Sequence, residues 1–191
     1  PQRDLPSSVL VPRFEEVAVD FAHRWDRKTS HHLTGAAVLD VDGDGREEIF
    51  VGGGAAQPNA LLGLRDGRLV DRIGGTGLES QGATYGSCAI DLDGDADVDL
   101  VVAHNEGVTI YVNEAGLFRP QRLPVELPEN SVPLAVTVSD IDHDRDADLY
   151  LSVFVDFPHF IPATFNVPEH AKANRLLRND GNLHFTDVTT P

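Results

Sequence analysis

Short apolar runs separated by turn-forming residues make up most of the chain, and three pairs of these runs share one arrangement. In each pair, a small or apolar stretch leads into a nine-residue acidic segment, which is followed by a run of β-branched, aromatic or other large apolar residues. The stretches before the acidic segments are residues 35–39, 87–90 and 135–138, and the runs after them are residues 49–51, 100–102 and 149–151. Because short apolar runs bounded by turn residues are typical of β-strands, each unit is predicted to begin as strand, acidic loop, strand.

A second pair of strands is predicted further along each unit. The paired runs are residues 60–64 and 68–73, 108–112 and 117–123, and 175–178 and 183–188. Two of the three connections contain an Asp-Gly dipeptide, at residues 66–67 and 180–181, which is a strong signal for a short hairpin. The sequence therefore predicts an all-β chain of three units, each with four short antiparallel strands and with little room for helix.

The acidic segments repeat the same spacing of carboxylates. They span residues 40–48, 91–99 and 140–148, so their first residues are 51 and 49 positions apart. Each has a carboxylate at its first, third, fifth and ninth position. In chain order these residues are Asp40, Asp42, Asp44 and Glu48; Asp91, Asp93, Asp95 and Asp99; and Asp140, Asp142, Asp144 and Asp148. A constant period of about 50 residues predicts a repeat architecture.

Most of the negative charge of the chain lies in these three segments. The 191 residues carry 31 acidic and 15 basic side chains, a formal net charge of −16, and 15 of the acidic residues belong to the acidic segments. Nucleic acids and anionic membrane surfaces are therefore poor partners, because they are bound through clustered Lys and Arg. Cys88 is the one cysteine, which excludes an internal disulfide and a cysteine-built zinc site. No apolar run is long enough to span a bilayer.

The spacing of the carboxylates suits a bound metal ion. Alternate carboxylates converge when the backbone curls around a point, and hard oxygen ligands of this kind suit Ca²⁺, which accepts six to eight of them. Without a cation the loop repels itself, since two carboxylates about 4 Å apart cost roughly 4 kcal/mol at an effective dielectric constant of about 20. Alternate acidic residues also line one solvated face of a strand, but the agreement of three segments favours up to three Ca²⁺ sites.

An EF-hand is excluded as the source of this pattern. Its loop requires a bidentate Glu at position twelve and amphipathic helices on both sides. Position twelve is here Val51, Val102 and Leu151, which all lie in predicted strands.

The loop pattern D-x-D-x-D-x-x-x-[DE] between two strands, repeated at this spacing, resembles the FG-GAP/VCBS repeat. The resemblance is closest to the bacterial ASPIC/UnbV and cartilage-acidic-protein branch, and further family-like phrases occur at residues 174–181, 185–188, 14–17 and 20–24. It covers about residues 14–190. The resemblance implies a β-propeller of the integrin-α type, with one Ca²⁺ in the loop that joins the first two strands of each blade.

The resemblance also implies a ligand set. The ligands would be the carboxylates named above together with the main-chain carbonyls at position seven, which belong to Arg46, Asp97 and Asp146. The family prefers Gly at position six. Gly45 conforms, whereas Ala96 and Arg145 do not, so these two residues are expected to adopt a positive φ that glycine tolerates best.

Three blades are too few to close a ring, because propellers have about four to eight. The expected division is an N-terminal segment over residues 1–33 with an isolated outer strand at 14–19, then blades over residues 34–82, 83–131 and 132–191. We therefore expect an incomplete or open arc of an FG-GAP-type propeller, either the N-terminal part of a longer chain or an arc completed by another subunit.

The third blade carries an insertion of about 15 residues near residues 154–170, judged against the length of the other two blades. Four of the nine phenylalanines lie in it, together with prolines that prevent a regular helix or a central strand. The insertion is interpreted either as a lid folded against its own blade or as a loop that docks a partner or contacts a membrane interface. The candidate partner-binding residues are Phe157, Phe160 and Phe165.

Signals for catalysis are lacking. The sequence has no nucleophile elbow, H-E-x-x-H motif, P-loop or dinucleotide fingerprint, and carboxylates that bind Ca²⁺ are poor proton carriers. His23, His31 and His32 precede the first blade and are interpreted as part of a solvated loop, with a transition-metal or haem contact as the alternative.

These observations predict a calcium-binding, non-enzymatic scaffold or protein-binding module. An extracytoplasmic location is expected, because the millimolar Ca²⁺ there matches affinities of about 10⁻⁴–10⁻³ M in extracellular modules. The expected partner is another protein or further blades of a longer chain. One alternative is an accessory subunit of a larger membrane or redox complex that docks through the phenylalanine-rich insertion. A second alternative is a propeller that hydrolyses glycans or phosphoesters.

Overall fold

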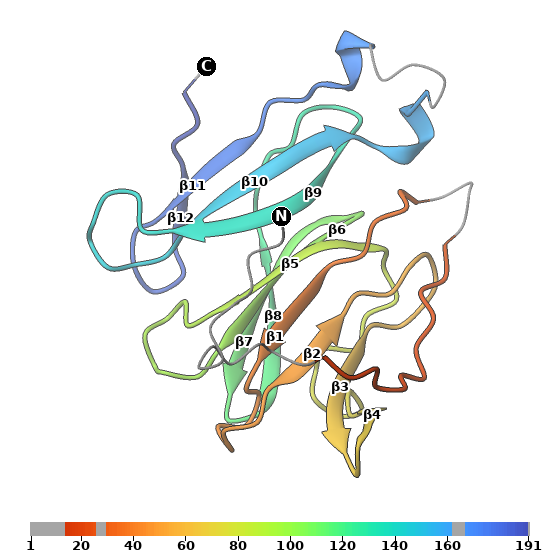
Figure 1. The fold of residues 1–191 in the computed structure, drawn as a ribbon. Coiled ribbons are helices and arrows are strands. Elements are labelled where there is room, and N and C mark those ends of the chain that lie inside the picture. Colours follow the sequence, from red (N-terminus) through yellow and green to blue (C-terminus); the bar gives the residue numbers. More distant parts are fainter. Residues whose placement is uncertain (1–13, 26–29, 162–166, 191) are drawn as a thin grey trace, which may run out of the picture.

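The computed structural model of the chain describes residues 14–25, 30–161 and 167–190. Within them, twelve strands form three four-stranded antiparallel sheets, and the helical structure amounts to two three-residue 3₁₀ turns. The three sheets are the three predicted units, in chain order (Figure 1). The prediction of an all-β chain of three four-stranded blades is therefore confirmed. No helix among the described residues has the length and the apolar character needed to cross a membrane.

In every blade the strands lie side by side in their order along the chain. Blade 1 contains β1 (Ala36–Leu39), β2 (Glu48–Val51), β3 (Ala60–Arg65) and β4 (Arg68–Asp71). Blade 2 contains β5 (Thr84–Ile90), β6 (Asp99–His104), β7 (Gly107–Glu114) and β8 (Leu117–Leu123). Blade 3 contains β9 (Ser131–Ser139), β10 (Asp148–Val155), β11 (Arg175–Asn179) and β12 (Phe185–Asp187).

Blade 2 is buried on both faces. Successive side chains of a strand point to opposite faces of the sheet, and in β6 Leu100 and Val102 pack toward blade 1 while Val101 packs toward blade 3. This explains why residues 100–103 form an uninterrupted apolar run instead of an alternating pattern. Each fully buried Leu or Val side chain contributes roughly 1.5–3 kcal/mol to stability.

Two apolar clusters join the blades. The first includes Phe50 and Leu61 of blade 1 together with Leu100 of blade 2, and the second includes Ile110 of blade 2 together with Leu149 of blade 3. All five side chains are almost completely excluded from solvent. The blades are thus held to one another by continuous cores between their facing surfaces.

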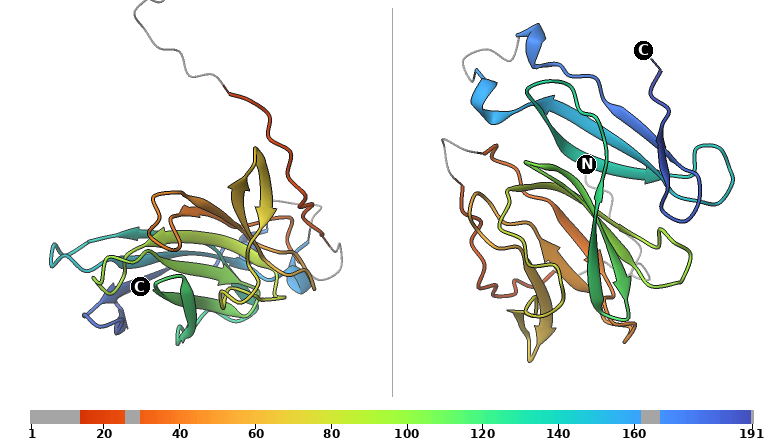
Figure 2. Two further views of the ribbon diagram at one scale, coloured as in Figure 1. Left: turned by 90° about the horizontal axis from the view of Figure 1, so that it is seen from below. Right: turned by 180° about the vertical axis from the view of Figure 1, so that it is seen from behind.

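The inner strands approach closely through a glycine at one repeated position, five residues before the first aspartate of the acidic loop. A Cβ atom on Gly35 would lie 2.7 Å from the carbonyl carbon of Gly86, and a Cβ atom on Gly86 would lie 2.8 Å from the Cα atom of Ala135. Only glycine allows this approach of the backbones. As a result β1, β5 and β9 follow one another on the inner side of the arc (Figures 1 and 2).

The two outer faces of the described arc are open. On the face of blade 1 directed away from blade 2, Val38 and Leu64 are 54% and 61% exposed. On the face of blade 3 that is also directed away from blade 2, Ile141 and Tyr150 are 41% and 43% exposed. The residue that corresponds to Tyr150 in blade 1 is Phe50, which is fully buried. Within the described residues the three blades therefore form an open arc, as expected (Figure 2).

The N-terminal segment runs along the outer edge of blade 1. Val19 pairs with Leu69 of β4 in a single parallel bridge. Residues 14–19, for which an isolated outer strand was expected, form this bridge in place of a strand. Further along, the buried side chain of Gln57 accepts a hydrogen bond from the N–H of Arg24 at 2.5 Å and donates one to the carbonyl of Ala22 at 3.0 Å. The blade boundaries drawn from the sequence stay a prediction.

The insertion in blade 3 folds back onto the chain. It contains the 3₁₀ turns Phe157–His159 and Pro168–His170, each with a proline in its first turn. The rings of Phe157 and Phe160 lie 5.7 and 5.6 Å from that of His31, between centroids. These contacts are made with the segment before blade 1, while Ala171 of the insertion region forms a bridge with Phe154 of β10 in blade 3. The lid against its own blade and docking through Phe157 and Phe160 both stay predictions. Phe165 lies outside the described residues.

Candidate metal centres

The three acidic loops join the first two strands of their blades and share one hydrogen-bonding scheme. In loop 1 (residues 40–48), the carboxylate of Asp40 accepts the N–H groups of Asp44 at 3.2 Å and Gly45 at 2.8 Å. The first aspartates of loop 2 (residues 91–99) and loop 3 (residues 140–148), Asp91 and Asp140, likewise accept two N–H groups from within their loops. The position-one carboxylate therefore holds each loop in a curl around itself.

The fourth and sixth positions of every loop have a positive φ. The values are 71° and 82° for Gly43 and Gly45, 80° and 77° for Gly94 and Ala96, and 65° and 84° for His143 and Arg145. The expectation for Ala96 and Arg145 is confirmed. The left-handed conformation costs a non-glycine residue roughly 1–2 kcal/mol, so the curl is kept in loops 2 and 3 at some cost in stability.

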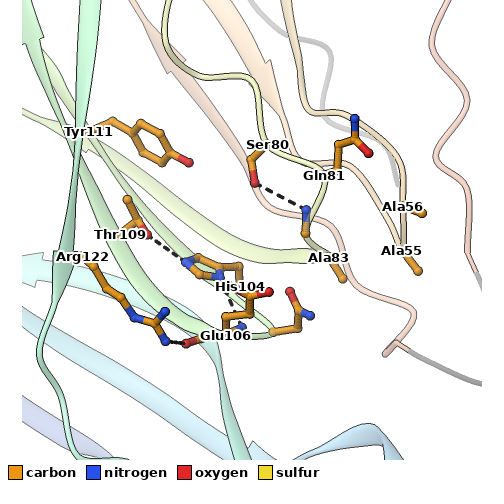
Figure 3. A pocket seen from close by; sticks show the side chains of 12 residues that line it. Ala55, Ala56, Ser80, Gln81, Ala83, His104, Glu106, Thr109, Tyr111 and Arg122 are labelled. Atoms are coloured by element: carbon orange, nitrogen blue, oxygen red, sulfur yellow. Dashed lines mark hydrogen bonds between the residues drawn. The ribbon is translucent and has the colours of Figure 1, made fainter.

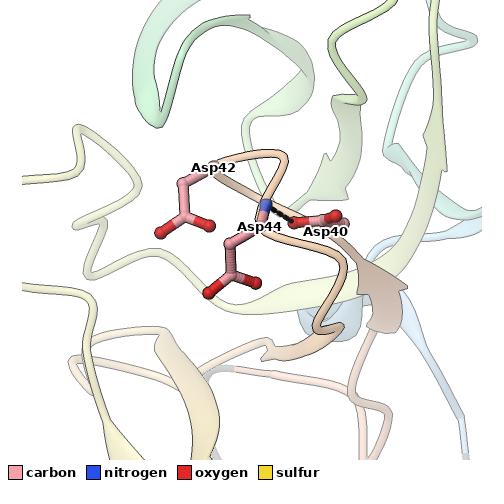
Figure 4. Close-up of side chains that lie close together, drawn as sticks. All are labelled: Asp40, Asp42 and Asp44. Atoms are coloured by element: carbon pink, nitrogen blue, oxygen red, sulfur yellow. Dashed lines mark hydrogen bonds between the residues drawn. The ribbon is translucent and has the colours of Figure 1, made fainter.

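Loops 2 and 3 bring together the carboxylates of positions one, three and nine. One oxygen from each of Asp91, Asp93 and Asp99 lies within 4.8 Å of the others, and Asp140, Asp142 and Asp148 form the same group. In loop 1 the group consists instead of Asp40, Asp42 and Asp44, at positions one, three and five (Figure 4). Glu48, the ninth residue of loop 1, does not belong to this group.

Position nine is the most buried part of the loop. The Asp99 carboxylate accepts the N–H groups of Leu92 and Asn113, both at 2.8 Å. The Asp148 carboxylate accepts those of Ile141 at 2.7 Å and Asn179 at 2.8 Å. Each carboxylate is therefore fixed in direction and keeps lone pairs for a further ligand.

Asn113 and Asn179 were missed in the sequence. They occupy the same place in β7 and β11, and their side-chain amides donate to the loop carbonyls of Val98 at 3.1 Å and Ala147 at 3.4 Å. Asn113 also donates to the carbonyl of Val41 in blade 1 at 3.0 Å, which ties two neighbouring loops together. The sequence feature that could have identified them is an asparagine placed two or three residues before the glycine of the second hairpin turn. It occurs in two of the three units.

The remaining carboxylates of the loops hold the backbone. At position five, Asp95 accepts the N–H of Asp97 at 2.8 Å and Asp144 accepts that of Asp146 at 2.9 Å. The side chain of Asp97 accepts the N–H of Ala115 in the β7–β8 turn at 2.9 Å. Ligation by the carbonyls of Arg46, Asp97 and Asp146 stays a prediction.

The electrostatics of loop 2 favour a bound cation. Burial raises the pKa of Asp99 to about 6, although the N–H groups of Asn113 and Leu92 stabilise the anion and oppose this increase. The charges of Asp93 and Asp95 add to the increase. Burial is also the largest cause that raises the pKa of Asp93. A cation among these oxygens would offset both the loss of hydration and the mutual repulsion. The donor set, made of carboxylate oxygens only, fits a hard ion such as Ca²⁺.

A second candidate site is a pocket of about 540 Å³ between blades 1 and 2, at the other end of β6 from the acidic loop (Figure 3). His104 accepts the N–H of Glu106 on Nδ1 at 3.2 Å, so the neutral ring carries its proton on Nε2 and donates it to Thr109 Oγ1 at 2.9 Å. Burial lowers the pKa of His104 and favours this neutral form. In this arrangement His104 cannot accept the Thr109 proton, so the pair is not arranged as a nucleophile and its base.

The three histidines before blade 1 have different surroundings. His23 is half-buried, and its Nε2 atom is enclosed by the protein. His32 is exposed and its ring contacts Trp25 edge-on, as expected for a loop at the surface. His31 is buried among Tyr85, Phe154 and the insertion, and its Nε2–H donates to the carbonyl of Val155 at 2.9 Å. The expectation of a solvated loop is wrong for His31, because the insertion folds over it.

A family model described as FG-GAP-like repeat matches the chain twice, over residues 40–102 and 91–151. Together the matches cover more than half of the 191 residues. The chain belongs to the FG-GAP-like repeat family. Each FG-GAP-like match begins at the first aspartate of an acidic loop and ends in the second strand of the next blade. FG-GAP repeats indicate a β-propeller-like, protein-binding type of module. Comparison with curated proteins gives no match.

Proposed function

We propose that this FG-GAP repeat chain is a calcium-stabilised, non-enzymatic module that binds another protein. The observation that supports calcium most directly is the meeting of three carboxylates, from positions one, three and nine, in loops 2 and 3. In both loops the backbone N–H groups already direct the first and ninth carboxylates. Ca²⁺ accepts a flexible shell of six to eight oxygens, whereas Mg²⁺ requires a nearly ideal octahedron, so we assign Ca²⁺ to this irregular set.

An extracytoplasmic location belongs to this proposal. The carboxylates at position three, Asp93 and Asp142, lie at the surface, so water molecules would complete the shell on that side, which is typical of the weak sites that fill at millimolar Ca²⁺. We also propose membership of the ASPIC/UnbV branch with blades of the integrin-α type. This is supported by the family-like phrases at residues 174–181 and 185–188, which form β11, the following turn and β12.

The proposed partner is a protein or further blades, and the open faces of the arc support it. Val38 and Leu64 expose large apolar side chains on one face of blade 1, and unpaired apolar faces of this kind favour association. In the alternative of an accessory subunit, docking would use the exposed Ile161 beside Phe160. The hydrolase alternative gains no support from His104, whose tautomer is unsuited to a base toward Thr109.

Thermal unfolding with and without calcium tests the proposal. A site with a Kd of about 10⁻⁴ M stabilises the fold by about 1.4 kcal/mol in roughly 1 mM CaCl₂, so millimolar CaCl₂ should raise the Tm by several degrees over EDTA, and MgCl₂ should raise it less. Asp93→Asn and Asp142→Asn should each remove part of the calcium-dependent increase. Glu129→Gln, at an exposed position between blades 2 and 3, is the control and should keep all of it. Equal melting curves in CaCl₂ and EDTA would refute the proposal.

A further inference from the structure

The ninth residue of loop 1 has a partner that its counterparts lack. Glu48 Oε2 accepts the N–H of Val41 at 3.3 Å, as Asp99 and Asp148 accept the N–H of the second loop residue. The other oxygen, Glu48 Oε1, accepts from the guanidinium of Arg72, with 2.6 Å between Oε1 and Nη1. In blades 2 and 3 a backbone N–H occupies this second place.

The sequence of blade 1 explains this exchange. Register places Leu64 where the other blades have Asn113 and Asn179, and its side chain is exposed. The neighbouring Gly63 leaves room for the arginine, because a Cβ atom there would lie 2.7 Å from Cδ of Arg72. Glutamate is one methylene longer than aspartate, so its carboxylate reaches outward to Arg72.

Arg72 also reaches the third position of the loop. Its Nη2 lies 3.6 Å from Oδ2 of Asp42, so one guanidinium spans positions three and nine. In loops 2 and 3 these same two positions meet position one in a single group of carboxylates. The cation at this place in blade 1 is thus supplied by the chain itself.

We propose that Arg72 replaces a metal ion in blade 1, so that loop 1 is held by an ion pair and calcium binding is confined to loops 2 and 3. The calcium part of this inference rests on the proposed function. Its structural part rests on Glu48, whose side chain is 3% exposed and would be left as a buried charge with a single N–H partner if Arg72 were removed. The guanidinium also repels a divalent ion from Asp42.

Arg178 of blade 3 also lies near an acidic loop, but its main partner is a carboxylate outside that loop. It lies 3.9 Å from Asp142 but is paired with Asp180 at 2.7 Å. Both oxygens of Asp148 accept backbone N–H groups. Loop 3 therefore keeps its ninth carboxylate directed toward positions one and three.

Two measurements on the full chain test the inference. Isothermal titration with CaCl₂ should give two sites for the unaltered chain and a third for Arg72→Gln. In EDTA, Arg72→Gln should reduce the folding equilibrium constant about tenfold or more, because a charged hydrogen bond to a buried carboxylate is lost. Arg119→Gln is the matched control, since Arg119 forms an exposed pair with Glu114 at 2.7 Å, and it should change neither result.

A second set of variants keeps the test open if Arg72→Gln does not fold. Asp42→Asn should leave the two calcium sites of loops 2 and 3 in place, whereas Asp93→Asn and Asp142→Asn should each remove one. Three equivalent sites in the unaltered chain, one of them lost in Asp42→Asn, would overturn the inference. If no variant binds calcium, the proposed function fails. The urea midpoints in EDTA then decide on Arg72 alone, and a midpoint for Arg72→Gln equal to that for Arg119→Gln overturns its structural role.

Discussion

Single residues with a positive φ give the three acidic loops one backbone shape in spite of their different side chains. Position six is Gly45 in loop 1, Ala96 in loop 2 and Arg145 in loop 3, with φ between 77° and 84°. A Cβ atom on Gly45 would meet no other atom within 4 Å. The cost of a side chain here is therefore conformational and does not come from a steric clash.

Exchange of glycine and alanine at position six should change stability in opposite directions in two loops. Ala96→Gly should stabilise the metal-free protein by about 0.5–1 kcal/mol and Gly45→Ala should destabilise it by a similar amount, because the left-handed penalty outweighs the larger entropy of unfolded glycine. Urea unfolding in EDTA measures both values. Changes of the same sign in the two variants would contradict this explanation.

Protonation of His31 should destabilise the fold. Burial lowers the pKa of His31 below 6.5, although the bond to the Val155 carbonyl and the charge of Asp156 oppose this, and His32 adds to it. Between the lowered folded pKa and 6.5 the unfolded chain binds more protons than the folded chain, so this contribution is complete above pH 6.5 and is lost as the pH falls.

The urea midpoint in EDTA between pH 7.5 and 5.5 measures this effect. The unaltered chain should lose more stability over this range than His31→Gln, which keeps a hydrogen-bond donor without the titration. His32→Gln, at the exposed neighbour, should retain the slope of the unaltered chain. Parallel pH profiles for the unaltered chain and the His31→Gln variant would contradict the prediction.

At the scale of elements, loops 2 and 3 each depend on the third strand of their own blade. The side chain of Asn113 in β7 donates to the carbonyls of Val98 and Val41 and accepts the N–H of Gly116 at 2.8 Å. The asparagine therefore connects the acidic loop, the neighbouring blade and the β7–β8 turn.

Removal of this amide should weaken both the fold and loop 2. Asn113→Ala leaves buried backbone groups without partners, each costing about 1–3 kcal/mol, so the free energy of unfolding should fall by about 2 kcal/mol or more. The calcium affinity of loop 2 should fall as well, because the loop loses its support. Asn105→Ala, at an exposed position of the β6–β7 turn, serves as control. Unchanged urea midpoints and calcium titrations in Asn113→Ala would contradict this role.

The strands and the curl of the loops were predictable because both are local. The short apolar runs with their turn residues and the spacing of the aspartates lie within short windows, and the positive φ at Ala96 and Arg145 follows from the loop alone. The partners of position nine were not predictable in this way. Asn179 lies 31 residues from Asp148, and Arg72 lies 24 residues from Glu48. Such contacts depend on the register of the hairpins and, for Arg72, on the space that Gly63 leaves beside its side chain. A short sequence window contains neither kind of information.

At the scale of the whole molecule, the three acidic loops lie at the same end of their blades. Each joins the first strand to the second, so they share one edge of the arc, and they carry most of the formal charge of −16. Bound divalent ions would reduce this concentration of charge. The opposite edge carries the insertion and the pocket beside His104, so the two edges differ strongly in electrostatic character.

The contact between His31 and Val155 sets an order of events during synthesis. The two residues are 124 positions apart, and a ribosome adds about 5–20 residues per second. His31 is thus synthesised roughly 6–25 seconds before Val155. Blades 1 and 2 can assemble in that interval, whereas the segment around His31 cannot yet form its contact with Val155 of blade 3. The segment before blade 1 is therefore synthesised early but reaches its final packing only after the third sheet has formed.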